Sequence, residues 1–371
     1  MSVAPGQAAL RRPPGFGGAS AWVRARLFSS APNAVLTLVT LYLLWTLVPP
    51  LVDWAFLDAV WRAPDSRACR EVMGAGACWA FVVEKHRFIL FGTYPYDQHW
   101  RPVLAVLVFL ALYAASALGR LGARGLALVW VAGLVAIGLL MWGGVLGLPY
   151  VENERWGGLI LTLMLATVGL AAAFPLSVAL ALGRRSDLPV IRGLCVGFIE
   201  LVRGVPLISL LFMASVMLPL FLPSGVTIDK ILRAQIALVL FAAAYLAEAV
   251  RGGLQAVPAG QYEAADALGL PYWRKTWLVI LPQALKVSIP AIVNTFIAFL
   301  KDTSLVLIIG LFDLLSTIKV ALIEPAWSGF GVEGYLFASL VYFAFCFAMS
   351  QYSQGLERKL SRGGAAMLRA A

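Results

Sequence analysis

Long apolar runs separated by short polar segments dominate the chain from about residue 34 onward. A helix needs roughly 20 predominantly apolar residues to cross the hydrocarbon core of a bilayer. Eight stretches fit this requirement: 34–52, 102–118, 126–148, 157–182, 190–222, 230–250, 284–311 and 331–354. The stretch 190–222 is long and interrupted by prolines, so we expect a full span with an irregular start. The pattern predicts an all-α polytopic membrane protein with about eight transmembrane helices.

Composition agrees with a lipid environment. The chain is 61% hydrophobic and 13% charged, whereas soluble domains carry about 25% charged residues. The net charge is +10, yet the lysines and arginines stand singly or in pairs between apolar runs. Nucleic-acid binding would require a basic stripe interleaved with aromatic residues. We therefore expect membrane lipid around the chain and no nucleic-acid partner.

The basic residues also predict how the chain crosses the membrane, because cytoplasmic loops carry an excess of lysine and arginine. With the N-terminus inside, every span agrees with one orientation: both termini are cytoplasmic at the bacterial inner membrane, and the long loop 53–101 is periplasmic. The basic residues that this orientation places in the cytoplasm are Arg11, Arg12, Arg24, Arg26, Arg120, Arg124, Arg184, Arg185, Arg192, Arg251, Arg274, Lys275, Lys286, Arg358, Lys359, Arg362 and Arg369.

The loop 53–101 contains Cys69 and Cys78. An oxidising compartment permits a disulfide between them, and two unpaired thiols are the alternative. Its many aromatic residues favour a cap at the headgroup level. His86 and His99 also lie in this loop, and ordinary polar placement explains them. No cluster of histidines and cysteines has the spacing of a metal site, so no metal is expected.

The large loop 251–286 predicts a short helix. Pro258 suits a helix start, Glu263 and Asp266 are expected early in the helix, where its dipole favours acid, and Gly269 suits the position just beyond its end. Ala264 and Ala265 would expose little side chain and let a partner approach closely. A docking helix for a cytoplasmic partner and a linker helix on the membrane surface are both compatible with this pattern.

The same loop resembles the EAA loop of ABC importer permeases. That loop has the pattern Glu-Ala-Ala, three residues, Gly, nine residues, Ile, one residue and Leu-Pro. The chain matches every position from Glu263 to Pro282, except that Val279 stands where isoleucine is usual. In the family this loop docks into a cleft of the cytoplasmic ATPase and transmits its closure. The resemblance therefore assigns ATPase coupling to Glu263, Ala264, Ala265, Gly269, Leu281 and Pro282.

Two further segments resemble signatures of polar amino acid importers. They are Glu200-Leu-Val-Arg203-Gly204-Val205-Pro206, where Val205 replaces the usual threonine, and Lys301-Asp302-Thr303-Ser304. A charge at mid-bilayer costs roughly 2.5–3.5 kcal/mol on insertion scales. Acidic and basic groups on two facing helices would complement the two charges of an amino acid, and a structural ion pair between Glu200 and Arg203, three residues apart on one helix face, is the alternative. The predicted substrate path comprises Glu200, Arg203, Gly204, Pro206, Lys301, Asp302, Thr303 and Ser304.

The resemblance covers about residues 156–360. It implies a five-helix type I ABC importer core at 151–360, with three extra helices at 34–150, a cytoplasmic segment 1–33 and a cytoplasmic tail 361–371. This arrangement is similar to the larger permease of general L-amino acid ABC importers. The partners that it implies are a cytoplasmic ABC ATPase dimer, a second homologous permease, a periplasmic amino acid-binding protein and the amino acid substrate.

The chain has no Gly-x-x-x-x-Gly-Lys-Ser/Thr loop, so ATP and magnesium are expected in the partner ATPase and no cofactor in this chain. No catalytic histidine or nucleophile pattern is found, which predicts a transport subunit that is not an enzyme. A secondary carrier or channel would leave the EAA loop unexplained, and a membrane-embedded enzyme would need a catalytic group.

Overall fold

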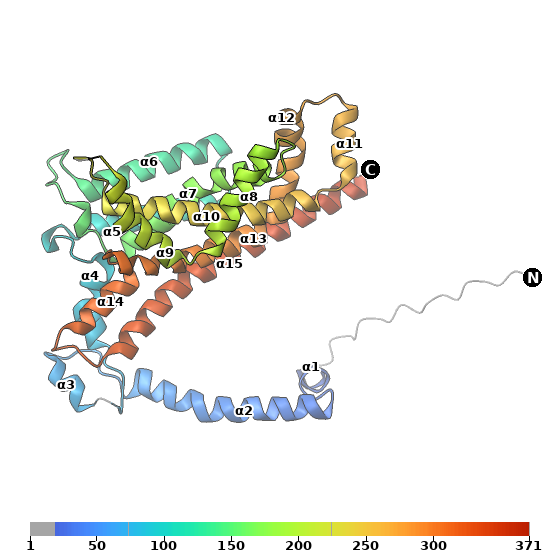
Figure 1. The fold of residues 1–371 in the computed structure, drawn as a ribbon. Coiled ribbons are helices and arrows are strands. Elements are labelled where there is room, and N and C mark those ends of the chain that lie inside the picture. Colours follow the sequence, from blue (N-terminus) through green and yellow to red (C-terminus); the bar gives the residue numbers. More distant parts are fainter. Residues whose placement is uncertain (1–18, 73, 224, 371) are drawn as a thin grey trace, which may run out of the picture. The chain divides into compact units, whose positions relative to one another are not determined.

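A computed structural model describes residues 19–72, 74–223 and 225–370, and across these residues the chain is helical, with no strand (Figure 1). Seven helical segments are long and apolar enough to cross a membrane, and a bent pair makes an eighth. The prediction of an all-α membrane protein with about eight spans is therefore confirmed. The seven are Ala31–Leu57, Tyr96–Leu118, Ala123–Trp142, Gly158–Arg184, Lys230–Ala256, Tyr272–Ile309 and Gly331–Arg358, and the bent pair is Pro189–Gly204 with Leu207–Phe221.

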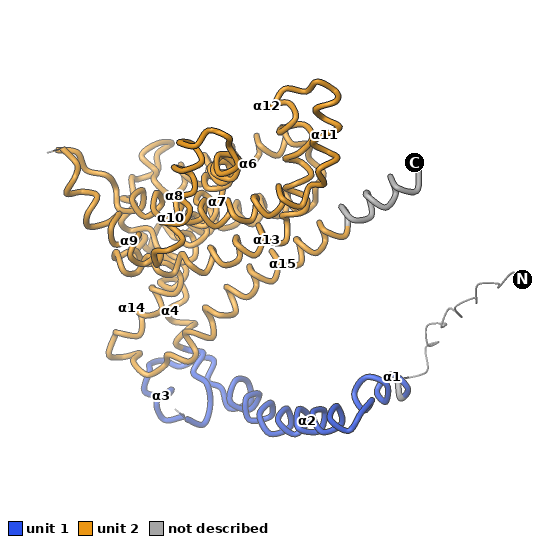
Figure 2. The backbone as a smooth tube through the Cα atoms, turned by 45° about the vertical axis from the view of Figure 1, so that its right-hand side comes forward, with its two compact units in different colours: residues 1–80 blue, residues 81–371 orange. Residues whose placement is uncertain are grey.

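The chain divides into two compact units, residues 1–80 and 81–371 (Figure 2). The division falls inside the loop 53–101. The reason is that α5 (Trp100–Leu118) and α6 (Ala123–Trp142) belong to the second unit, where α5 packs along α7 (Gly158–Arg184). The hydroxyls of Tyr113 on α5 and Thr167 on α7 form a hydrogen bond between these two helices.

The first unit holds α1 (Ala19–Arg26), α2 (Ala31–Val52), η1 (Asp53–Leu57) and α3 (Ser66–Glu71). Of the two alternatives for its cysteines, the structure has the bridge: Cys69 and Cys78 form a disulfide, and both are buried. The indole of Trp79 stacks on Trp61 at 5.8 Å between ring centroids and donates to the Ala55 carbonyl at 2.7 Å. The aromatic residues thus hold the loop together around the disulfide.

The second unit is built around α10 (Lys230–Ala256), which packs against α7 and α13 (Leu281–Asp302). Small residues let the helices approach, as is usual between membrane helices. At Gly253 of α10 an added Cβ would lie 2.3 Å from the carbonyl oxygen of Ala284 on α13, so no side chain fits there. The Ser288 hydroxyl donates to the Ala249 carbonyl at 3.0 Å and fixes the level at which α13 crosses α10.

One end of this unit, which we call the α4 end, joins α4 (Ala80–Phe91) to the starts of α7 and α14 (Leu314–Ile323). Gly92 and Gly157 touch backbone to backbone, and the Thr317 hydroxyl donates to the Ile89 carbonyl at 2.9 Å. Asp313 is fully buried and caps α14, and it accepts from the Tyr342 hydroxyl of α15 (Gly331–Ala370) at 3.0 Å. Burial raises the pKa of the Asp313 carboxyl, while its hydrogen bonds lower it.

Arg101 closes the same end between α5 and α6. Its side chain is fully buried, and its guanidinium donates to the carbonyls of Leu140 at 2.5 Å and Pro149 at 2.9 Å. A cation is favourable at the C-terminus of a helix, where carbonyl groups lack intrahelical partners. Arg101 therefore ties the start of α5 to the end of α6, although the sequence alone gave it no role.

Candidate functional site

The predicted short helix is present as α11 (Ala259–Ala267), at the end of the second unit that we call the α11 end. Pro258 precedes its first residue. At its other end Gly269 has φ +69°, and the amides of Gly269 and Leu270 donate to the carbonyls of Asp266 and Ala265 at 2.9 and 3.2 Å. This pair of hydrogen bonds is a Schellman motif, in which glycine avoids the strain of left-handed backbone. The predicted position of Gly269 is confirmed.

The exposed side of α11 differs in part from the expectation. Glu263 and Ala264 are exposed, but Ala265 is buried against the rest of the unit. Asp266 lies in the last turn instead of the first, and Lys275 compensates its charge at 2.5 Å. Leu268, beside Gly269, is 78% exposed. The exposed surface around α11 thus contains the acidic Glu263, the small Ala264 and the large apolar Leu268.

The chain after α11 continues as α12 (Tyr272–Arg274) and η6 (Lys275–Ile280) into α13. Trp273, Trp277 and Leu278 are exposed by more than half. Leu281 is buried and Pro282 is exposed at the first turn of α13. The continuous segment Tyr272–Ile309 has 38 residues, about 57 Å of helix, which is far longer than a bilayer core of about 30 Å. One end of it must therefore project from the membrane.

A polar contact connects α11 to the helix bundle. The Arg185 guanidinium, just after α7, donates to the Tyr262 hydroxyl at 3.0 Å and to the Leu254 carbonyl at 3.1 Å. The Tyr262 hydroxyl itself donates to the same carbonyl at 3.1 Å. Tyr262 immediately precedes Glu263, so the residues expected to couple to the ATPase are fastened to the ends of α7 and α10.

The neighbouring residue, Arg184, belongs to a cluster of charged side chains from three helices. It donates to Glu200 of α8 (Pro189–Gly204) at 3.0 Å and to Glu248 of α10 at 2.8 Å. Glu248 also accepts from Arg251 at 2.8 Å and lies 3.8 Å from Arg203. We call these five residues the arginine–glutamate cluster. It carries three positive and two negative charges, and Glu248 is its centre.

The structure does not have the alternative that the sequence left open, a structural ion pair between Glu200 and Arg203. Each pairs instead with another helix, because α8 lays its polar face on α7 and α10. Sequence reasoning missed Glu248, and it assigned Arg184 and Arg251 only to loops. The sequence did contain a signal for Glu248, because a carboxylate within an apolar span is rare and is usually functional. Glu200 meets Arg184, the last residue of α7, so it lies near the end of the bundle and not at its middle.

The predicted interruption at Gly204 and Pro206 is confirmed. Here α8 ends and α9 (Leu207–Phe212) begins at an angle of 103°. Val205 is extended, with φ −110° and ψ 135°, as expected for a residue before proline. Beyond α9 the chain continues through η4 (Met213–Met217) and η5 (Leu218–Phe221). The span 190–222 is thus a sharply bent pair of helices, with Arg203 at its corner.

The second predicted set lies further along the bundle than the arginine–glutamate cluster. Glu248 neighbours Ala249, which is level with Ser288, and Lys301 lies thirteen residues further along α13, about 20 Å. Thr303 is fully buried, and its hydroxyl donates to the Leu300 carbonyl at 2.8 Å. It opens η7 (Thr303–Ile309), which packs on α9. Lys301, Asp302 and Ser304 remain partly or fully exposed. Because α9 begins directly after Pro206, the second set neighbours the part of the first set at the helix break, whereas Glu200 belongs to the arginine–glutamate cluster.

Bent and long membrane-spanning helices, with a capped helix at one end, are compatible with a membrane transport component. In agreement, the family model described as "Binding-protein-dependent transport system inner membrane component" matches residues 173–362. The match covers just over half of the chain, which therefore belongs to this family. It is a multi-pass inner-membrane protein.

The chain is also similar over nearly its whole length to individual proteins. It is 52% identical to the Inner membrane amino-acid ABC transporter permease protein YhdY of Escherichia coli, over 93% of this chain and 94% of that protein. It is 40% identical to the Glutamate/glutamine/aspartate/asparagine transport system permease protein BztC of Rhodobacter capsulatus, again over 93% and 94%. The predicted resemblance to amino acid ABC transporter permeases is confirmed.

Among solved structures, the crystal structure of an amino acid ABC transporter with histidines is 32% identical. That match covers 54% of this chain and 92% of that chain, with a TM-score of 0.49. The Probable glutamine ABC transporter permease protein GlnP of Bacillus subtilis likewise matches 54% of this chain and 91% of its own length. These shorter relatives thus correspond to little more than half of this chain.

Proposed function

We propose that the chain is the permease subunit of an ATP-driven amino acid importer, that it forms the translocation path with a second homologous permease, and that loop 251–286 couples it to a cytoplasmic ATPase dimer. ATP and Mg²⁺ belong to that dimer. A periplasmic binding protein delivers the amino acid at the α4 end, and both termini are cytoplasmic. The similarity to amino acid permeases supports the substrate class.

The observation that carries the coupling role is the fastening of α11. An exposed helix with Glu263, Ala264 and Leu268 on its surface is joined to α7 and α10 through Arg185 and Tyr262. A Schellman end is common to many helices, but a linker helix that merely rests on the membrane surface would not need the three-group polar contact to fix its position. A docking element needs this contact, because any looseness would lose the displacement that the ATPase applies.

The same contacts suggest how movement reaches the translocation path. Arg185 and Arg184 are adjacent at the end of α7, so displacement of α11 acts directly on the arginine–glutamate cluster. Arg203 of this cluster stands beside the break at Gly204 and Pro206, where α8 turns into α9. Two ion pairs on α8 would shift with α7 and α10, and the break would convert that shift into a change of the angle between α8 and α9. The bundle can then open and close at this corner.

The test is uptake of a radiolabelled amino acid by the complete complex in proteoliposomes loaded with ATP, with a protonophore added. Uptake that needs ATP and survives the protonophore is expected, and uptake that the protonophore abolishes would indicate an ion-coupled carrier instead. For the coupling role, Glu263→Lys should abolish co-purification of the ATPase, whereas Glu263→Gln should retain it. Normal co-purification and uptake in Glu263→Lys would refute docking through α11.

A further inference from the structure

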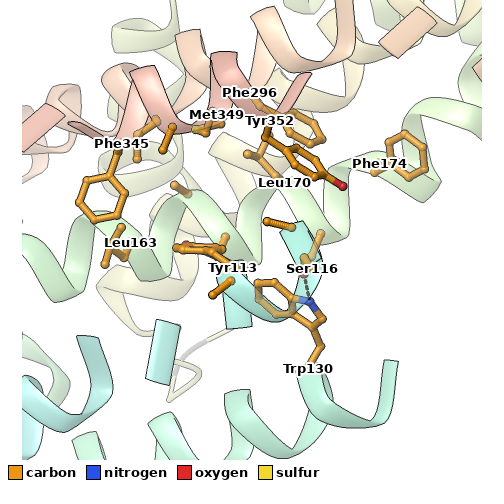
Figure 3. A pocket seen from close by; sticks show the side chains of 17 residues that line it. Tyr113, Ser116, Trp130, Leu163, Leu170, Phe174, Phe296, Phe345, Met349 and Tyr352 are labelled. Atoms are coloured by element: carbon orange, nitrogen blue, oxygen red, sulfur yellow. Dashed lines mark hydrogen bonds between the residues drawn. The ribbon is translucent and has the colours of Figure 1, made fainter. Parts of the chain in front are cut away.

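A cavity of about 620 Å³ lies apart from the arginine–glutamate cluster, between α5, α6, α7, α13 and α15. Figure 3 shows side chains from these helices facing into it, with Tyr113 near its centre. Its volume is within the range of ordinary ligand pockets, roughly 300–1,000 Å³. The cavity is only about half enclosed, so a molecule from outside the protein can enter it.

The walls of the cavity are almost entirely apolar, and no charged residue lines it. Four of its polar side chains are paired within the wall: Tyr113 with Thr167, and the Trp130 indole, which donates to the Ser116 hydroxyl at 2.9 Å (Figure 3). The Tyr352 hydroxyl is a further polar group of the wall, and it carries no charge. A zwitterionic amino acid would have no partner for either charge there. The remaining wall consists of hydrocarbon and aromatic faces, which suit a flexible apolar chain.

Two exposed arginines stand near the cavity, at the turn between α5 and α6. Ala117 lines the cavity three residues before Arg120, and Trp130 lines it six residues after Arg124, about 9 Å along the helix. Within the described part of the chain neither arginine forms an ion pair. An apolar cavity among membrane-spanning helices, with unpaired cations where those helices end, is complementary to a lipid with an anionic headgroup.

From these observations we infer that the cavity binds an acyl chain of an anionic phospholipid, whose phosphate lies against Arg120 and Arg124. The lipid fills the space between α5 and α6 on one side and α7, α13 and α15 on the other. It would thus complete the packing of the two helices that precede the region matched by the family model. This inference stands independently of the ATPase-coupling role, because none of its residues belongs to α11 or to the arginine–glutamate cluster.

The experiment uses the complete complex in nanodiscs that contain a trace of phosphatidylglycerol carrying a diazirine in its acyl chain. A parallel sample contains phosphatidylcholine with the same labelled chain. After illumination, the labelled residues are mapped by mass spectrometry. Phosphatidylglycerol should label cavity residues such as Leu170, Phe296 and Met349 more strongly than phosphatidylcholine does. Equal labelling by the two lipids, or labelling confined to residues outside the cavity, would overturn the proposal.

Matched variants separate the acyl chain from the headgroup. Ala114 and Ala111 are exposed alanines on α5, and only Ala114 lines the cavity. Ala114→Trp should remove labelling of the cavity by both lipids, and Ala111→Trp should leave it intact. The double variant Arg120→Gln, Arg124→Gln should lower labelling by phosphatidylglycerol by about thirtyfold, as the loss of two surface arginines implies, and leave labelling by phosphatidylcholine unchanged.

Equal labelling of the two tryptophan variants would show that the chain does not enter the cavity and would refute the site. An unchanged preference for phosphatidylglycerol in the double arginine variant would refute the assigned headgroup contact. A cavity filled by another protein helix would give no lipid labelling in the unmodified complex, which is also a refutation. ATP-driven uptake, measured in parallel, reports separately on the proposed transport function.

Discussion

Arg184, the last residue of α7, donates to Glu248 of α10 at 2.8 Å, and the same nitrogen lies 3.0 Å from Glu200 of α8. One guanidinium therefore holds three helices together at the end of the bundle from which α11 projects. Glu248 is mostly buried, with 16% of its side chain exposed, and it is shared with Arg251 and Arg203. Because these ion pairs join three helices, substitution of one charged residue should change the stability and the transport activity of the bundle.

Removal of the Glu248 charge should destabilise the second unit. Glu248→Gln would leave three arginines around a neutral amide, and breaking a buried ion pair by removing one partner costs about 3–5 kcal/mol. A clear fall in melting temperature of the purified complex is expected, together with loss of uptake. Glu154→Gln, at an exposed glutamate near the α4 end, is the control and should melt normally. Identical melting of the two variants would contradict the central role of Glu248.

Arg185 should be needed for transmission but not for docking. Arg185→Gln removes the cation that joins Tyr262 and the Leu254 carbonyl to the end of α7, while the exposed side of α11 is unchanged. We expect the ATPase to co-purify normally, with its stimulation by substrate-loaded binding protein lost. Arg192→Gln, at an exposed arginine of α8, should keep stimulation. Full stimulation in Arg185→Gln would exclude this contact from the coupling route.

The backbone of Gly269 gives a second test of α11. Gly269 has φ +69°, and nothing lies within 4 Å of an added Cβ, so alanine there meets strain but no clash. Left-handed backbone costs a residue with a side chain roughly 1–2 kcal/mol. Gly269→Ala should weaken ATPase co-purification by about tenfold at that cost. Gly260→Ala, an open helical position of α11 without positive φ, should bind at least as well as the unmodified chain. Equal weakening of both would mean that the left-handed turn is irrelevant.

The orientation of the chain in the membrane can be tested by thiol labelling of intact cells, in a chain with Cys195 and Cys346 replaced by alanine. Glu154→Cys, near the α4 end, and Asp65→Cys, in the loop 53–101, should react with a membrane-impermeant maleimide. Ala259→Cys, on α11, should react only after permeabilisation. Position 362, which the sequence also predicts to be inside, lies beyond the described side chains. Protection of Glu154→Cys with labelling of Ala259→Cys would reverse the topology.

The Cys69–Cys78 bridge should be visible by mass spectrometry. Denaturation and alkylation without reductant should modify only Cys195 and Cys346, and prior reduction should add two further adducts. In the chain-entropy view, a bridge that closes so short a loop stabilises by about 2–3 kcal/mol. The double variant Cys69→Ala, Cys78→Ala should therefore increase proteolysis between residues 58 and 80. Four adducts without reductant would show that the thiols are free in the purified protein.

The sequence by itself determined the class of protein, the spans and the α11 helix. The length of an apolar stretch can be read directly from the sequence, and a stretch that is long enough to cross a bilayer is stable in lipid. The eight spans therefore follow from the lengths of the apolar stretches. Gly269 was assigned correctly for the same reason, because left-handed backbone is decided within one turn of the chain. The break at Gly204 and Pro206 also follows from the covalent geometry of proline. None of these conclusions requires knowledge of which residues of other helices pack against these segments.

Only the tertiary structure decided which charges meet. Glu200 and Arg203 share one helix face, so helix periodicity favours a pair between them, yet each finds a closer partner on α7 or α10. The level at which α13 crosses α10 is likewise set by the contact of Ser288 with Ala249, and no local pattern encodes that level. The buried role of Arg101 and the cavity beside Tyr113 arise in the same way. Ion pairs, buried cations and cavities depend on several helices at once, and their energies are fixed by packing between segments far apart in the chain.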